Sequence, residues 1–87
     1  MNNLEAAREK LEAHGGYGWL LEGPAFWSVK QVVEELGKNG RQVSVSTATR
    51  WFRDLPHTQG TKGPGGLSAS KNDLIVLFAS QMGPRNR

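Results

Sequence analysis

Cysteine is absent from the 87 residues, and histidine occurs only as His14 and His57. A chain without cysteine forms no disulfide and no thiolate metal site, and this composition is typical of proteins of the reducing cytoplasm. The two histidines are far apart in the sequence, and no carboxylate cluster has the spacing of metal ligands. We therefore expect a cytoplasmic protein without a metal ion or any other cofactor.

Long apolar runs are also missing, since the longest extends only from Leu74 to Ala79. Such a run is far too short to cross a membrane, and the segment "MNNLEAAREKLEAHGG" lacks the apolar core of a secretion signal. We therefore expect no membrane partner.

Catalytic motifs are absent as well. The stretch "GTKGPGG" is only superficially similar to a phosphate-binding loop, because it lacks the Gly-Lys-Ser/Thr ending and a preceding strand. No serine-nucleophile motif or acid–base pair stands out, and so short a chain leaves little area for an enclosed active site. The sequence predicts a protein that is not an enzyme, has no small-molecule substrate and acts through its surface.

Basic residues outnumber acidic residues, 11 to 8, which gives a formal net charge of +3. The excess is uneven, because residues 1–27 carry a net charge of −2 and residues 28–87 carry +5. This separation predicts that the second part faces nucleic acid, whereas the first part is scaffold or contacts a partner protein.

The segment before residue 28 is expected to hold one helix and a connector. "NNLEAAREKLEAHGG" is typical of a helix capped by Asn2 or Asn3 and stopped by Gly15-Gly16. In the connector, residues 19–21 are expected to form a short strand or a turn.

The best-marked helix lies in "SVKQVVEELGKNG". Ser28 is its expected N-cap, Gln31 completes a capping box and Gly37 is the expected stop. Trp27 and Val32 are spaced for a hydrophobic staple across the start of the helix.

The segment "VSVSTATRWFRDLP", residues 43–56, allows two interpretations. Its first four residues alternate as in a half-buried strand, whereas a helix over 45–54 capped by Ser44 separates apolar from polar residues completely. We favour the helix. Its apolar arc holds Val45, Ala48, Trp51, Phe52 and Leu55. Its polar arc holds Ser46, Thr47, Thr49, Arg50 and Arg53.

The polar arc has an unusual composition for a solvated helix face. Serine and threonine each cost about 0.5 kcal/mol in helix propensity, and no acidic residue appears in this helix before Asp54. Short hydroxyls let a helix approach a phosphate backbone closely, and arginine can fork onto guanine or phosphate. This composition is what a DNA-reading helix needs.

Beyond residue 56, "HTQGTKGPGG" predicts a flexible loop, a hairpin loop or a wing. "SASKNDLIVLFASQMGP" follows, with Ser70 as cap, Asp73 three residues on and Gly83-Pro84 as terminator. Its apolar run could be a buried strand, but the caps favour a helix. A domain this small needs its aromatic rings in the core or beside helix starts. These rings are Trp19, Trp27, Trp51, Phe26, Phe52 and Phe78.

"STATRWFRDLP", followed by a wing-like loop and a short helix with serine caps, resembles the small winged helix-turn-helix domains of the MerR and phage excisionase type. In that family the second helix ends in an aromatic residue followed by a leucine-proline step into the wing, and Trp51, Leu55 and Pro56 match those positions. The resemblance covers roughly residues 28–82 and implies that residues 45–54 form a recognition helix in the major groove.

We therefore expect a mainly α fold: a winged helix-turn-helix with an extra N-terminal helix and a short glycine-rich wing. Residues 1–83 would form one domain, divided into an N-terminal helix and connector (1–27), the helix-turn-helix (28–56), the wing (57–69) and a C-terminal helix (70–83). Residues 84–87 would be a disordered basic tail.

The expected function is sequence-specific binding of double-stranded DNA, as a small transcriptional regulator, an excision factor or a plasmid or phage DNA-organising protein. A homo-oligomer on DNA is expected, because one such module covers only a short site. The DNA-binding residues would be Ser46, Thr47, Thr49, Arg50, Arg53, Lys30, Arg41 and Lys62.

The alternative is a protein–protein interaction module that keeps the helix-turn-helix scaffold. In that case the acidic N-terminal helix would be the docking surface, and the charges that matter would be Glu5, Glu9 and Glu12 rather than the arginines.

Overall fold

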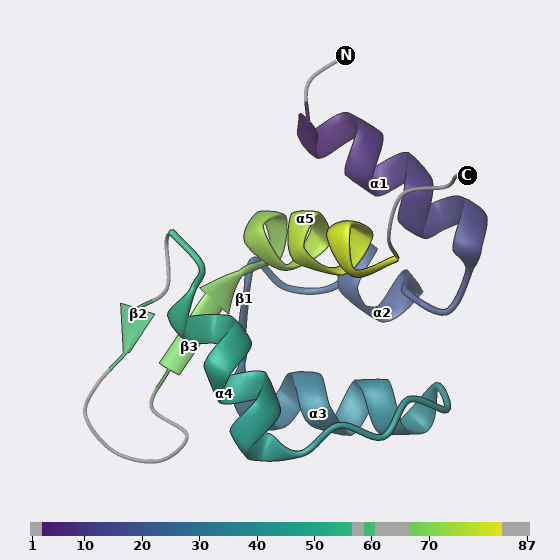
Figure 1. The fold of residues 1–87 in the computed structure, drawn as a ribbon. Helices are drawn as coiled ribbons and strands as arrows, with labels where there is room; N and C mark the ends of the chain where they lie inside the picture. Colours follow the sequence, from purple (N-terminus) through teal and green to yellow (C-terminus); the bar gives the residue numbers. More distant parts are fainter. Residues whose placement is uncertain (1–2, 57–58, 61–66, 83–87) are drawn as a thin grey trace.

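The computed structural model describes residues 3–56, 59–60 and 67–82, and within them the chain is mainly helical (Figure 1). The helices are α1 (Asn3–His14), α2 (Gly18–Leu21), α3 (Val29–Lys38), α4 (Val45–Arg53) and α5 (Lys71–Gln81). The strands are β1 (Phe26–Ser28), β2 (Gln59–Gly60) and β3 (Leu67–Ser70). The mainly helical prediction is confirmed. The helix predicted over residues 45–54 is present and ends one residue earlier, at Arg53. The expected tail, the terminator and most of the expected wing lie outside the described residues.

The strands form a small antiparallel sheet in the order β1-β3-β2. β1 pairs with β3 from Phe26 opposite Ser70 to Ser28 opposite Ser68. Gln59 and Gly60 of β2 pair with the other edge of β3. The sheet therefore joins the segment before α3 to the segment before α5, and the sequence predicted neither β1 nor β3.

Three helices begin with a serine N-cap, as the sequence predicts. The Ser28 hydroxyl accepts a hydrogen bond from the Gln31 backbone N–H at 3.2 Å, and the Gln31 side chain accepts one from the Ser28 backbone N–H at 2.9 Å. Ser44 and Ser70 cap α4 and α5 in the same way, each accepting from a backbone N–H at 3.1 Å. Each cap satisfies a backbone donor that has no partner within the helix.

Two local predictions were wrong. Residues 19–21 belong to the short α-helix α2, whereas the sequence predicted a strand or a non-helical turn there. The end of α3 lies beyond Gly37, which stays helical; the residue with positive φ is Gly40, at +89°. There the Gly40 N–H donates to the Gly37 carbonyl at 3.1 Å and the Arg41 N–H donates to the Leu36 carbonyl at 2.9 Å. This is the Schellman arrangement, which needs a glycine after the cap residue and not inside the last turn.

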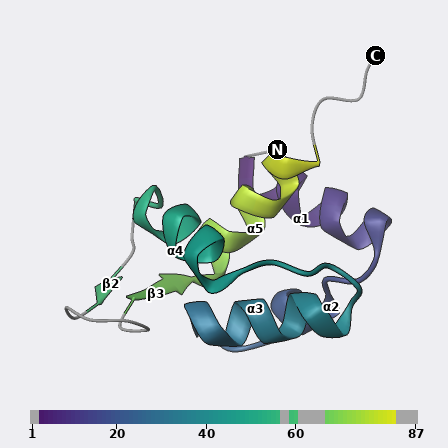
Figure 2. The same ribbon diagram turned by 60° about the horizontal axis from the view of Figure 1, so that its bottom comes forward.

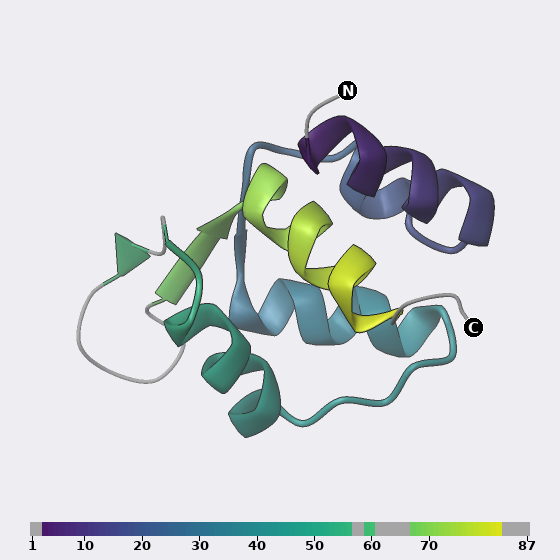
Figure 3. The same cartoon turned by 45° about the horizontal axis from the view of Figure 1, so that its top comes forward.

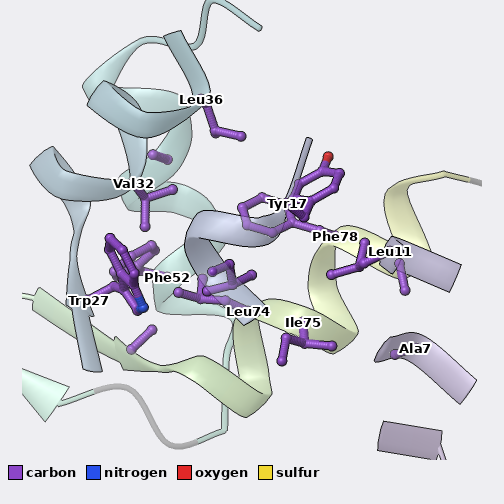
Figure 4. Close-up of a cluster of buried hydrophobic side chains, with 14 of the residues drawn as sticks. Ala7, Leu11, Tyr17, Trp27, Val32, Leu36, Phe52, Leu74, Ile75 and Phe78 are labelled. Carbon is purple, nitrogen blue, oxygen red and sulfur yellow. The ribbon is translucent and has the colours of Figure 1, made fainter. Parts of the chain in front are cut away.

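The core surrounds α5. α1 lies along α5, and α2 and β3 also contact it, while α3 packs against α4 (Figures 2 and 3). Leu11 of α1 and Leu74, Ile75 and Phe78 of α5 are fully buried in the core (Figure 4). The apolar run of α5 is thus explained by burial on several sides. No helix in the described part of the chain has the length and apolar content that crossing a membrane requires.

One aromatic residue departs from the expected core. Phe26 on the edge strand β1 is 53% exposed, whereas its neighbour Trp27 is buried. Successive residues of a strand point to opposite faces, so only one of the two can enter the core. Trp27 does so, and its ring meets the Trp19 ring edge to face with centroids 5.2 Å apart.

Gly23, between α2 and β1, makes room for this pair of tryptophans. A Cβ atom placed on it would lie 2.5 Å from Cζ2 of Trp27 and closer still to the backbone oxygen of Trp19. The Gly23 carbonyl accepts a hydrogen bond from Nζ of Lys71 at 3.0 Å, which ties this segment to the start of α5. The backbone has little freedom to move away from an added methyl group.

Gly23→Ala should therefore lower the free energy of unfolding by about 1–3 kcal/mol, the usual cost of overpacking. The matched control is Gly18→Ala, because a Cβ at Gly18, the first residue of α2, meets nothing within 4 Å. That variant should stay within about 1 kcal/mol of the wild type, on the stabilising side. Urea denaturation of the three proteins makes the comparison, and equal stability of the two variants would contradict this packing around Gly23.

Candidate functional site

α4 lies at one side of the molecule, with α3 on its inner side and β3 beside it (Figures 1 and 2). Ala48 and Phe52 are fully buried, and Trp51 and Leu55 are partly buried against the core. These residues recur at the three- and four-residue spacing of a helix face. The opposite side of α4 is therefore turned away from the protein.

The side chains on that opposite side form two neighbouring rows. One row is Val45, Thr49 and Arg53, and the other is Ser46 and Arg50, each row with the four-residue spacing of an α-helix. We call these five residues the outer face of α4. In both rows the N-terminal members are short and the C-terminal member is an arginine, so the outer face is shallow at its start and basic toward its end.

Hydroxyl groups cluster at the start of α4. The Ser44 hydroxyl donates to Oγ1 of Thr47 at 2.9 Å and lies 3.2 Å from Oγ of Ser46. Because Ser44 has one hydroxyl proton, Ser46 is the donor in the second contact. The Thr47 proton has no acceptor among the described residues, so Thr47 keeps a free donor at the helix start.

Thr49 is arranged differently from the other hydroxyl residues. Its Oγ1 donates to the backbone carbonyl of Val45 at 2.7 Å, one turn earlier in the helix. Its only hydroxyl proton is therefore engaged inside α4.

Val45 departs from its expected place on the apolar arc. It is 45% exposed, because it is the first residue of the helix and the segment before it does not cover it. Helical periodicity alone places Val45 beside Phe52 and could not have shown this exposure.

Arg50 and Arg53 are exposed, and neither is in an ion pair within the described residues. The pairing with Glu34 or Glu35 that would make them ordinary surface arginines is not found there: Glu35 pairs instead with Lys38 at 3.6 Å. Both guanidinium groups keep their donors available for another molecule.

Arg41 is oriented inward. Its guanidinium carbon lies 5.1 Å from the centroid of the Trp51 ring and 5.9 Å from that of Phe78, and its Nη2 donates to the Gln81 side chain at 2.7 Å. The Schellman turn at the end of α3 holds its backbone in place. These contacts join the turn after α3 to α4 and to the end of α5, which is a structural role apart from the outer face of α4.

Lys30 and Lys62 complete the expected basic set. Lys30 is exposed in the first turn of α3, the helix that packs against α4. Lys62 lies outside the described residues, between β2 and β3. Among the described residues, no group of three or more histidine, cysteine or acidic side chains could hold a metal ion.

Comparisons with protein-family models, with curated proteins and with solved structures give no match for this chain.

Removing the Arg41 side chain should destabilise the fold. Arg41→Ala abolishes the stacking on Trp51 and the hydrogen bond to Gln81, and we expect the free energy of unfolding to fall by about 1–2 kcal/mol. Lys30→Ala removes the same charge from an exposed helix position and should stay within about 0.5 kcal/mol of the wild type. Thermal and urea denaturation measure the stability of both variants. If Arg41→Ala were as stable as Lys30→Ala, the contacts of Arg41 with Trp51 and Gln81 would not contribute to stability.

Proposed function

We propose that this protein binds double-stranded DNA by placing the outer face of α4 in the major groove. The observation that carries the proposal is the pair of exposed arginines, Arg50 and Arg53, which have no acidic partner among the described residues. A helix face with two uncompensated guanidinium groups and short side chains elsewhere can approach a phosphate backbone closely.

The surroundings of α4 support a winged helix-turn-helix arrangement. α3 packs against α4 as the first helix of such a motif does, residues 39–44 form the turn, and β3, paired with β2, lies beside α4 in the place of a wing. In this arrangement the first residues of the second helix contact base edges. Those residues here are the short side chains of Val45, Ser46 and Thr49.

The remaining expected contacts divide by their position. Thr47, at the helix start, is suited to donate to a phosphate, Ser46 lies beside it with its proton directed to Ser44, and Lys30 offers a charge from the first turn of α3. Arg50 and Arg53 would contact a base edge and the backbone. Arg41 would act by holding the turn and α4 in place rather than through a phosphate contact.

Its role would be that of an accessory protein: a small regulator, an excision factor or a DNA-organising protein that acts through occupancy of a site. A single α4 covers few base pairs, so useful specificity would come from two or more copies on one site. The acidic α1, on the other side of α5 from α4, would stay clear of the DNA (Figure 3).

The test is fluorescence anisotropy of a labelled mixed-sequence duplex at several salt concentrations. The wild type should bind more weakly as salt rises, and Arg50→Ala/Arg53→Ala should reduce the log–log salt slope by about one for each phosphate that is no longer neutralised. Affinity at low salt should fall at least tenfold, since charge-assisted hydrogen bonds contribute about 1.5–3 kcal/mol each.

The matched control is Arg8→Ala/Lys10→Ala, which also removes two positive charges, but from α1. It should leave the salt slope nearly unchanged. Absence of wild-type binding at low salt would refute the proposal and favour a protein partner for α1, whereas an equal loss of affinity in both double variants would show that net charge and not α4 determines binding.

A further inference from the structure

The outer face of α4 contains two groups that charge does not explain, the Val45 side chain and the Thr49 methyl group. Among the described residues, three large apolar side chains are exposed: Phe26, Val45 and Val76, at 53%, 45% and 41%. Val45 is the one that lies on α4. Its exposure removes the usual reason for a valine at that position, which is contribution to the core.

Thr49 lies next to Val45 in the same row of the outer face. Because its hydroxyl proton goes to the Val45 carbonyl at 2.7 Å, the hydroxyl is not free to donate to DNA. The same hydrogen bond holds the rotation about the Cα–Cβ bond, so the methyl group also has a fixed position. Thr49 is half-buried, and with its hydroxyl proton engaged the group left for a partner is its methyl.

The row continues to Arg53, one more turn along α4. If Arg53 contacts the phosphate backbone, Val45 and Thr49 are at the end of the helix that reaches the base edges. Among the four bases, only thymine presents an apolar group in the major groove, its C5 methyl. The methyl groups of valine and threonine are suited to contact it.

We propose, on the basis of the DNA-binding function proposed above, that Val45 and Thr49 select thymine in the bound site through contact with its C5 methyl group. Discrimination between sequences then comes from a small apolar patch at the start of α4, while Arg50 and Arg53 supply most of the affinity.

The experiment begins with selection of bound duplexes from a random library by the wild-type protein. Each thymine in the selected duplex is then replaced, one at a time, by deoxyuridine, which keeps every hydrogen-bonding group and lacks only the methyl. At one or two positions affinity should fall about fourfold, the factor expected for burial of one methyl group. Anisotropy titrations at fixed salt measure the change.

Variants assign the effect to the two side chains. Val45→Ala and Thr49→Ser should each reduce the difference in affinity between thymine and deoxyuridine at one of these positions toward zero. Thr49→Ser retains the hydroxyl that bonds to Val45, and Thr49→Val, which retains a methyl group, should preserve the difference. Val76→Ala changes an exposed valine of α5 and should leave the difference at its wild-type value.

The outcomes separate this inference from the function on which it rests. If the wild type shows no salt-dependent binding, or Arg50→Ala/Arg53→Ala binds as well as the wild type, the DNA-binding proposal fails and this inference fails with it. If binding and the arginine dependence are found, but the selected site has no thymine, deoxyuridine binds equally well, or the difference persists in Val45→Ala and Thr49→Ser, the inference alone is wrong.

Discussion

The ring of Phe78 lies where the separate parts of the molecule meet. It is fully buried on α5, 5.5 Å from the Tyr17 ring and 6.2 Å from the Trp19 ring on one side, and 6.0 Å from the Trp51 ring on the other. The Arg41 guanidinium, from the turn after α3, also lies over the Phe78 ring, with its carbon 5.9 Å from the ring centroid. So small a domain has little apolar area to bury, and the contact of Trp51 with this cluster adds to the packing of α4 on α3 and β3.

Local features of the fold were predictable because their causes are local. The N-caps at Ser28, Ser44 and Ser70 are recognisable from residue type and spacing, and the structure has all three. The sheet was not predictable in this way. β1 is three residues long, too short to show a strand period, and its partner β3 is near the other end of the chain. Long-range pairing of short strands leaves almost no trace in sequence pattern.

In the candidate site, too, features with local causes were predictable and features that depend on distant parts of the chain were not. Helical periodicity was enough to place Ser46, Arg50 and Arg53 on the side of α4 away from the core. It could not show that Arg41 is stacked on Trp51, because that contact depends on where the Schellman turn directs the chain. It also could not show that Val45 is exposed, because periodicity describes direction around a helix and not how far the neighbouring elements reach along it.

The pairing of β1 with β3, together with the packing of α1 on α5, has a consequence for synthesis of the protein. α1 and β1 find their main partners in α5 and β3, which are synthesised after them. Until these later residues have been synthesised, α1 and β1 lack their main packing partners and remain accessible to chaperones and proteases. A nascent chain that stops before β3 and α5 therefore lacks both the strand that pairs with β1 and the helix on which α1 packs.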